Sequence, residues 1–260
     1  MKMFDKVAFI FPSFSNRRFG NSVRNGSPCF RHEDGVRRKF AFTLAEVLIT
    51  LGIIGVVSVL TIPNIISNYQ KKVYVTQLQK GYNQISNAVA LLMVDEEVNN
   101  LNDTYLYCDD DVESSDVCLS RVGDFLKKYF KVSKDCGYGD NRYECGDFDN
   151  YKLLDKTIYG IPTNTYCVNI NSGMTLCIVA PGYCPLAIYL DINGKKGPNT
   201  WGRDAFYFDV NFEGDIAESF SGYPYHMDNW PNDPERCLEN ESYNSGCFTK
   251  IINDGWKMDY

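Results

Sequence analysis

Apolar positions divide the chain into a helical first part and a strand-rich second part. From Phe42 to Ile66 the sequence FTLAEVLITLGIIGVVSVLTIPNII holds 25 residues and a single charge, on Glu46. About 20 apolar residues in a helix suffice to cross the ~30 Å hydrocarbon core of a bilayer. We therefore predict that residues 42–66 form a membrane-spanning helix, in which the lone carboxylate requires a functional explanation.

The helical pattern continues beyond Ile66 and becomes amphipathic. Apolar side chains recur at steps of four, three, four and three residues, the spacing of one helix face, at Leu78, Tyr82, Ile85, Val89 and Leu92. Residues 67–98 are thus predicted to be the amphipathic half of one helix that runs from Phe42 to about Val94, ~80 Å in length. Pro63 lacks an amide hydrogen, so we expect a kink or local loosening there.

The remaining residues have other patterns. Residues 100–150 are acidic and rich in turn formers, with one short helix predicted at Arg121–Val132. After residue 156, short β-branched and aromatic runs follow between Gly, Pro and Asn: TIYGIPTNTYCVNI, MTLCIVA, LAIYLDI and AFYFDVN. A helix followed by strands predicts an α+β head, residues 99–260, whose antiparallel strands pack on the outer half of the long helix. Residues 1–38 show no sustained periodicity, and we interpret them as an unstructured leader.

Charge is distributed unevenly along the chain. Residues 1–41 hold nine Lys/Arg and three Asp/Glu, a net +6, whereas residues 42–260 hold 17 and 30, a net −13. Arg37, Arg38 and Lys39 directly precede the apolar run, which keeps that end on the cytoplasmic side and the acidic head outside. The acidic head argues against direct contact with DNA or RNA, because phosphate binding needs clustered Lys and Arg.

Cysteine usage agrees with an oxidising location for the head. Of the ten cysteines, only Cys29 precedes the apolar run. Eight fall into neighbouring pairs of similar spacing, Cys108/Cys118, Cys136/Cys145, Cys167/Cys177 and Cys237/Cys247, and Cys184 is left over. The sequence leaves the connectivity open, but these pairings would close short loops worth ~2–3 kcal/mol each. A zinc site is poorly supported, because there is no Cys-x-x-Cys and His226 is the one histidine after the run.

The start of the chain carries a specific set of residues: the basic Arg37-Arg38-Lys39, the small Ala41, then Phe42-Thr43-Leu44-Ala45-Glu46, the apolar run, Gly55 and Pro63. Over roughly residues 37–75 it resembles type IV pilins and type II secretion pseudopilins. The resemblance implies a pilin-like fold and a membrane-embedded prepilin peptidase that cuts between Ala41 and Phe42 and methylates the new amino terminus of Phe42. Ala41 stands where the family usually has Gly.

The resemblance also suggests a role for Glu46. In the family, this glutamate is thought to meet the terminal amine of a neighbouring subunit in the filament core. An α-amine is mostly protonated near neutrality, with a reference pKa of ~7.7–8.0, and a buried ammonium and carboxylate are each costly alone but tolerable as a pair. Gly55 and Pro63, with Gly52, would permit helix extension during assembly, although glycines that pack helices look the same. The alternative places Glu46 at the lipid headgroups of a plain single-span anchor.

The loop DINGKKGPNTWGRDAF in the head has a start similar to calcium loops. Lys195 and Gly202 stand where later ligands are expected, so it is not an EF-hand. Major pseudopilins have a calcium loop late in the head, and that resemblance makes four residues candidate donors: Asp191, Asn193, Asp204 and Asp209. A plain pair of Asn-Gly and Gly-Pro turns is the alternative. No other cofactor is expected. We also predict no enzymatic activity, because neither G-x-S-x-G nor a Gly-rich phosphate loop is present.

These features lead to one hypothesis and one alternative. The chain is predicted to be a prepilin-like subunit of the bacterial cytoplasmic membrane, single-pass with its head outside, which then enters a cell-surface or periplasmic filament. That filament would be a type IV pilus or a type II secretion pseudopilus. Expected partners are prepilin peptidase, other pilin-like subunits in a homo- or hetero-oligomer, and the inner-membrane assembly platform. The alternative is a single-span membrane-anchored extracellular binding module that does not polymerise. Removal of residues 1–41 distinguishes the two.

Overall fold

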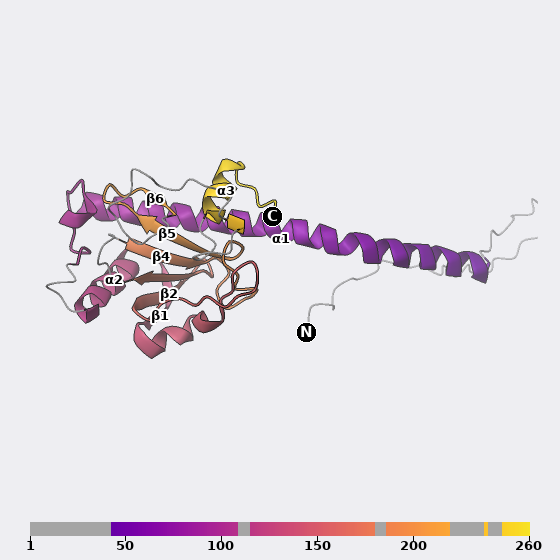
Figure 1. Cartoon of the computed structure of the whole chain (residues 1–260), viewed down its shortest axis with the longest axis horizontal. Coiled ribbons are helices and arrows are strands. Elements are labelled where there is room, and N and C mark those ends of the chain that lie inside the picture. The colour runs from indigo at the N-terminus through magenta and orange to yellow at the C-terminus, as the bar shows by residue number, and fades with distance from the viewer. Residues whose placement is uncertain (1–42, 109–114, 180–185, 219–236, 239–245) are drawn as a thin grey trace, which may run out of the picture. The chain divides into compact units, whose positions relative to one another are not determined.

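The computed structural model describes residues 43–108, 115–179, 186–218, 237–238 and 246–260 (Figure 1). The predicted leader, the cleavage pair Ala41 and Phe42, Cys184 and His226 lie outside these residues. The chain divides into two compact units, Met1–Leu51 and Gly52–Tyr260. Three α-helices are present among the described residues: α1 (Leu44–Asp95), α2 (Ser115–Tyr129) and α3 (Cys247–Asn253).

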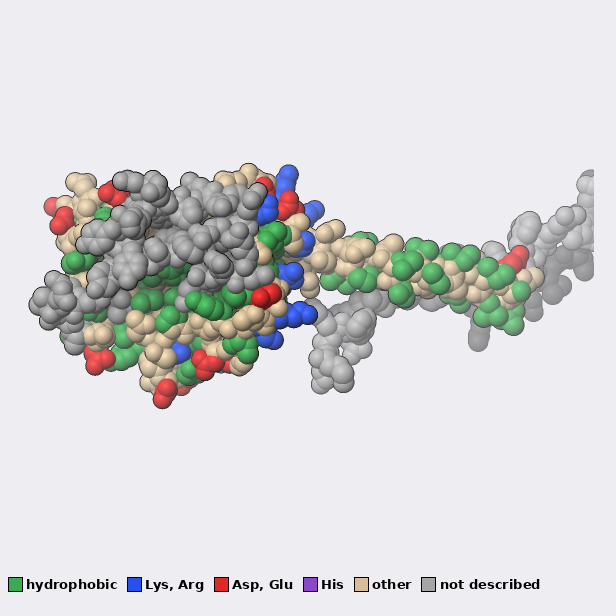
Figure 2. Space-filling model, viewed as in Figure 1, with side chains coloured by type: hydrophobic (Ala, Val, Ile, Leu, Met, Phe, Trp, Pro, Cys, Tyr) green, Lys and Arg blue, Asp and Glu red, His purple; other side chains and the backbone are tan. Residues whose placement is uncertain are grey.

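Helix α1 confirms the long helix expected from the apolar pattern. It begins at Leu44, ends at Asp95 and continues through Pro63 without a break in the helix, where we expected a kink or local loosening. From residue 52 to residue 70 almost every side chain is exposed (Figure 2). The second half buries one face: Val75, Leu78, Gly81, Ile85, Ala88, Val89 and Leu92. Tyr82 of the predicted stripe is only partly buried.

The head contains one antiparallel sheet in which each strand pairs with the next along the chain. Its strands are β1 (Val132–Gly137), β2 (Thr165–Ile170), β3 (Thr175–Val179), β4 (Leu186–Asp191), β5 (Ala205–Val210) and the two-residue β6 (Ile216–Ala217). Short 3₁₀ helices lie at Leu101–Asp103, Gly139–Glu144 and Phe148–Asn150. The α+β class and the antiparallel sheet predicted from the sequence are therefore confirmed.

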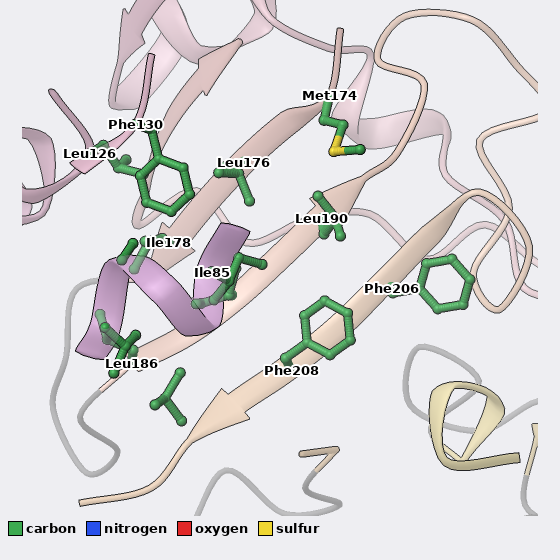
Figure 3. Close-up of a cluster of buried hydrophobic side chains, with 14 of the residues drawn as sticks. Ile85, Leu126, Phe130, Met174, Leu176, Ile178, Leu186, Leu190, Phe206 and Phe208 are labelled. Carbon is green, nitrogen blue, oxygen red and sulfur yellow. The ribbon is translucent and has the colours of Figure 1, made fainter. Parts of the chain in front are cut away.

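Helix α1 packs against the middle strands of the sheet. Ile85 lies among Leu176, Ile178 and Leu190 in a cluster of buried hydrophobic side chains (Figure 3). Gly81 permits this approach, because a Cβ built there would lie 2.7 Å from Leu190 Cδ2. Helix α3 extends the same cluster, since the ring of Phe248 contacts that of Phe208 at a centroid distance of 4.6 Å.

The opposite face of the sheet is also covered. Alternate side chains point to opposite faces of a strand, and Cys167, Cys177, Tyr189 and Ala205 belong to a second buried cluster. Most of the rest comes from the segment between β1 and β2, where Phe148 packs against Tyr151. Tyr151 in turn packs against Trp201, from the loop between β4 and β5. Both faces are buried, which explains why the middle strands read as continuous apolar runs in the sequence.

The neighbouring cysteine pairs are disulfides in the structure. Bonds join Cys108 to Cys118, Cys136 to Cys145, Cys167 to Cys177 and Cys237 to Cys247. Cys167 and Cys177 lie directly opposite each other on β2 and β3, so this bond staples two adjacent strands. The disulfides predicted for an oxidising compartment are thus present in the fold.

Two boundaries differ from the sequence-based expectation. The short helix expected at Arg121–Val132 lies at Ser115–Tyr129, because Val132 already begins strand β1. The strand expected from residue 157 begins only at Thr165. Pro162, which has no amide hydrogen for a ladder bond, lies in the irregular stretch before it.

Candidate functional site

The amino-terminal end of α1 places Glu46 in a local hydrogen-bond motif. The Thr43 amide donates to Glu46 Oε2 at 2.8 Å, and the Thr43 hydroxyl donates to the same oxygen at 3.0 Å. In return, the Glu46 amide donates to Thr43 Oγ1 at 3.2 Å. This reciprocal arrangement is a capping box, which satisfies amides that the first helical turn leaves without partners. Its signature, Thr-x-x-Glu, stands in the sequence, although the motif was not predicted.

The charge of Glu46 has no counter-ion in the part of the chain that the structure describes, since no Lys or Arg there lies within 4 Å of its carboxylate. The side chain is exposed. The capping box thus accounts for the hydrogen bonds of the carboxylate and leaves its charge unbalanced. Such a group can accept a cationic partner from outside the described residues without first breaking an ion pair.

The remaining assembly candidates lie on the apolar half of α1. A Cβ built at Gly52 or Gly55 would meet nothing within 4 Å, so no packing among the described residues requires glycine at either position. The hydroxyl of Thr61 donates to the Val57 carbonyl at 2.9 Å, which satisfies a polar group inside the helix itself. Residues Leu44–Asp95 form the one helix among the described residues that is long and apolar enough to cross a membrane.

The loop after β4 brings three of the four predicted calcium donors together. Asp191 is 3% exposed and accepts hydrogen bonds from the Tyr151 hydroxyl and from the amides of Asn193 and Gly194, the latter two at 3.0 and 2.8 Å. Asp204 is fully buried and accepts from the Asn193 side-chain amide at 3.0 Å. Its carboxylate also accepts the backbone amides of residues 199 and 200, at 2.9 and 2.6 Å.

Burial disfavours the ionised form of both loop carboxylates, Asp191 and Asp204. It raises the pKa of Asp191 to about 8, and the nearby charge of Asp204 acts in the same direction, while the hydrogen bonds from Tyr151 and the backbone oppose it. Burial also raises the pKa of Asp204. Two further oxygens, Asn193 Oδ1 and Asn199 Oδ1, are buried with no hydrogen-bond partner among the described residues. Oxygen donors of these kinds are the ones that Ca²⁺ prefers.

The fourth predicted donor does not join this group. Asp191 pairs with Ala205 across β4 and β5, whereas Asp209 lies four residues further along β5, opposite Ala187. At ~3.3 Å per residue this places Asp209 ~13 Å from the loop, where it accepts a hydrogen bond from Tyr207. Within the described residues, no group of three or more His, Cys, Asp or Glu is arranged to hold a metal. Calcium at this loop stays a prediction.

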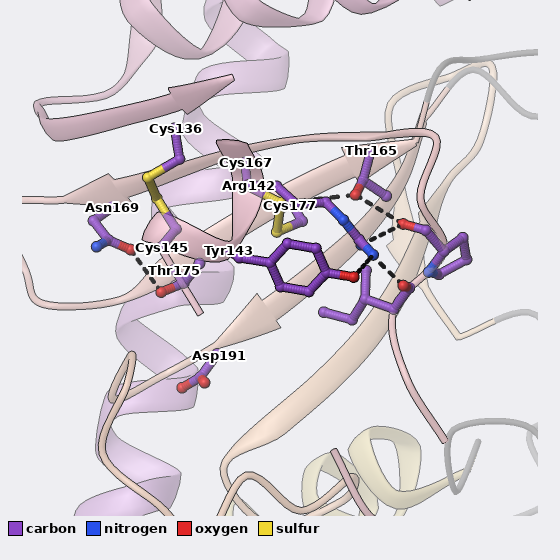
Figure 4. Close-up of a disulfide and its surroundings, with 12 residues drawn as sticks. Cys136, Arg142, Tyr143, Cys145, Thr165, Cys167, Asn169, Thr175, Cys177 and Asp191 are labelled. Atoms are coloured by element: carbon purple, nitrogen blue, oxygen red, sulfur yellow. Dashed lines mark hydrogen bonds between the residues drawn. A yellow bond between two sulfur atoms is a disulfide. The ribbon is translucent and has the colours of Figure 1, made fainter. Parts of the chain in front are cut away.

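Two buried charged residues were not anticipated from the sequence. Arg142 is 1% exposed, and its guanidinium donates to the carbonyls of Ile161 and Pro162 at 2.9 and 2.7 Å (Figure 4). It thereby fastens the irregular segment before β2 to the disulfide-bonded turn after β1. Nothing in the local sequence marks this arginine, because the carbonyls that bind it follow about twenty residues later.

Glu218, the second of these residues, holds the carboxyl-terminal helix. It is 4% exposed and accepts backbone amides from Gly246, Phe248 and Thr249 at 2.9, 3.1 and 2.9 Å. Burial raises the pKa of this carboxyl to about 7. Three amides at the start of α3 thus converge on one side chain, which gives Glu218 a structural role next to the disulfide of Cys247.

No known protein family, no curated protein and no solved structure matches this chain.

Proposed function

We propose that this chain is a prepilin-like subunit that prepilin peptidase cleaves between Ala41 and Phe42 and methylates at Phe42. The mature chain assembles through α1 into a type IV pilus or a type II secretion pseudopilus. It begins as a single-pass protein of the bacterial cytoplasmic membrane with its head outside, and the inner-membrane assembly platform moves it into the filament. The observation that carries this proposal is a long helix with an exposed apolar half and one uncompensated carboxylate near its start.

The exposed apolar surface of the first half of α1 must be shielded from water by lipid or by another protein. Ile53, Leu60 and Ile65 are 59–68% exposed, and similar side chains surround the helix on every side. A bilayer covers such a surface before assembly, and the apolar halves of neighbouring helices cover it in a filament core. A helix that moves from lipid into a filament core must be apolar on all sides rather than amphipathic. This half of α1 is apolar on all sides.

Glu46 favours assembly over simple anchoring. A charge within a span is expensive and commonly marks a functional site with a partner. The methylated amine of Phe42 from a neighbouring subunit is a suitable partner, because it is cationic and would lie level with Glu46 if the adjacent parallel helix were shifted by about one turn, ~6 Å. The alternative, a membrane-anchored binding module that does not polymerise, also explains the span and the disulfide-bonded head. For that module, Glu46 needs no role beyond the capping box with Thr43.

Substitutions at Glu46 separate the two roles. Glu46→Gln keeps the capping box, because glutamine serves at this position as well as glutamate, but it removes the charge. Thr43→Ala weakens the cap and keeps the charge. We expect Glu46→Gln to reduce the recovery of sheared filaments at least tenfold while insertion is unchanged, and Thr43→Ala to have a much smaller effect. Glu213→Gln, an exposed head residue, is the control for loss of one acid.

Failure of the unmodified chain to form sheared filaments would favour the anchored module and refute the assembly proposal. If the unmodified chain and Glu46→Gln form filaments equally well, whereas Thr43→Ala loses helix content or insertion, Glu46 acts only as a cap and its proposed pairing with Phe42 is refuted. Membrane fractionation of each variant distinguishes loss of assembly from loss of insertion.

A further inference from the structure

A basic groove lies where the apolar half of α1 ends. It has a volume of about 580 Å³ and is formed by about three turns of α1, residues 68–79, and by the carboxyl-terminal tail, both within residues 52–260. Lys71 and Lys72 line it from the helix, and Trp256 and Lys257 line it from the tail. We call these four residues the basic collar. Two segments that are far apart in the sequence therefore present cations to the same space.

The collar differs in charge from the rest of the head. Among the residues that the structure describes, none of its three lysines has a carboxylate within 4 Å. The acid that lines the groove, Asp259, lies 3.8 Å from Lys250 Nζ. Residues 42–260 as a whole carry a net charge of −13. A cluster of three lysines is therefore unusual for this part of the chain. Lys and Arg gather at the side of the head next to the exposed helix (Figure 2).

The collar also lies at a particular height along α1. Lys71 is the fifth residue after Ile66, the end of the apolar run, and this distance is ~7.5 Å along a helix. The headgroup region extends about 5–8 Å beyond the hydrocarbon core on each side. When the apolar run is inserted, Lys71 and Lys72 therefore lie at the level of the lipid phosphates.

An exposed aromatic residue at the same level supports this placement, since Tyr69 is 68% exposed and lies two residues before Lys71. Trp256 lines the groove from the tail and is partly buried against Phe248 and Tyr82, the latter ~15 Å beyond Lys72 along the helix. Trp and Tyr are enriched at both interfaces of a membrane because their rings are amphipathic. Cations together with interfacial aromatics are the chemistry that recognises an anionic lipid surface.

We propose that the basic collar docks the head on the headgroups of anionic phospholipids in the membrane that α1 spans. This inference rests on the membrane insertion of the proposed function, and it adds that the head is held at the bilayer surface until assembly. The head as a whole is acidic and would be repelled by an anionic bilayer. The collar supplies local attraction at the point where the chain leaves the lipid.

The test uses the full chain in nanodiscs of phosphatidylcholine alone or with phosphatidylglycerol, each with and without a lipid whose headgroup carries a spin label. The label quenches the fluorescence of Trp256 when the tail lies at the headgroups. Trp230 is replaced by Phe in every sample, and Trp201 is fully buried. We expect at least threefold stronger quenching with phosphatidylglycerol, and loss of that difference at about 0.5 M KCl, where the Debye length is about 4 Å.

Two triple variants test whether the lysines of the basic collar cause the extra quenching. Replacing Lys71, Lys72 and Lys257 by Gln should abolish the extra quenching. Replacing Lys127, Lys128 and Lys131 by Gln, an equal change of charge near the other end of α1, should leave it intact, because Lys128 pairs with Asp95, ~35 Å along the helix from Lys72.

Equal quenching in the two lipids, or equal quenching in the two triple variants, would overturn the docking proposal while leaving filament assembly untouched. A chain absent from the disc fraction would overturn membrane insertion and, with it, the docking that depends on it.

Discussion

Replacing Asp191 by Asn should remove much of the pH dependence of the stability of the head. The Asp191 side chain is 3% exposed, and its pKa is raised to about 8 by burial. In the unfolded chain an aspartate has a pKa of about 3.9. Between these values the native state binds the proton more tightly than the unfolded state, so the free energy of unfolding falls as the pH rises. Asparagine has nearly the same shape and cannot ionise.

The size of the effect follows from this shift. A group that is protonated only in the native state contributes a slope of about 1.4 kcal/mol per pH unit. From about pH 5 to about pH 8, we therefore expect the unmodified chain to lose on the order of 3 kcal/mol more than Asp191→Asn. Burial also raises the pKa of Asp204, and raises that of Glu218 to about 7, so both groups contribute slopes of the same sign that remain in the variant.

Urea unfolding in EDTA, monitored by tryptophan fluorescence, provides the measurement. Trp201 is fully buried and packs against Tyr151, whose hydroxyl donates to Asp191, so its emission reports on this region. Asp103→Asn, at an exposed position, controls for loss of one carboxylate. Parallel stability curves for the unmodified chain and Asp191→Asn across this pH range would refute the raised pKa of Asp191.

Three further outcomes are expected. Leu78→Ala should lower the free energy of unfolding by about 2–5 kcal/mol, because Leu78 is fully buried. The control Leu91→Ala, at a 51% exposed site, should lower it by under about 1 kcal/mol. Equal losses for the two variants in urea titrations would refute the packing of α1. Glu218→Gln should cost about 1–3 kcal/mol and speed proteolysis of the carboxyl-terminal segment, since it weakens the acceptor for three amides, whereas Glu213→Gln should do neither. Calcium should raise the melting temperature more at pH 8 than at pH 5, because the loop carboxylates must ionise to bind it, and Asp191→Asn should abolish the gain; an equal gain in the variant would exclude this loop.

The long helix was predictable because its information is local. Apolar residues without interruption define the first half of α1, and the 3.6-residue repeat defines the second, so both ends were placed to within two residues. The middle strands and the disulfide-bonded cysteine pairs were also visible as short patterns. The capping box at Thr43 has an equally local signature, Thr-x-x-Glu, and was not predicted.

The features that escaped prediction depend on contacts between distant segments. Strand β1 has the polar sequence VSKDCG and is a strand because it pairs with β2, some thirty residues later. Arg142 is buried by carbonyls that only the folded chain brings to it. The resemblance to pseudopilin calcium loops grouped Asp209 with Asp204, but an extended strand carries the two residues apart.

Intact-mass and amino-terminal peptide analysis of the membrane-extracted chain tests the central proposal most directly. The unmodified protein and Ala41→Glu are compared under non-reducing conditions from a host with an active prepilin peptidase. We predict that the unmodified chain begins at methylated Phe42 and that the variant retains the residues before it. An unmodified chain that still carries the segment preceding Phe42 would contradict the prepilin proposal and leave the membrane-anchored binding module as the better explanation.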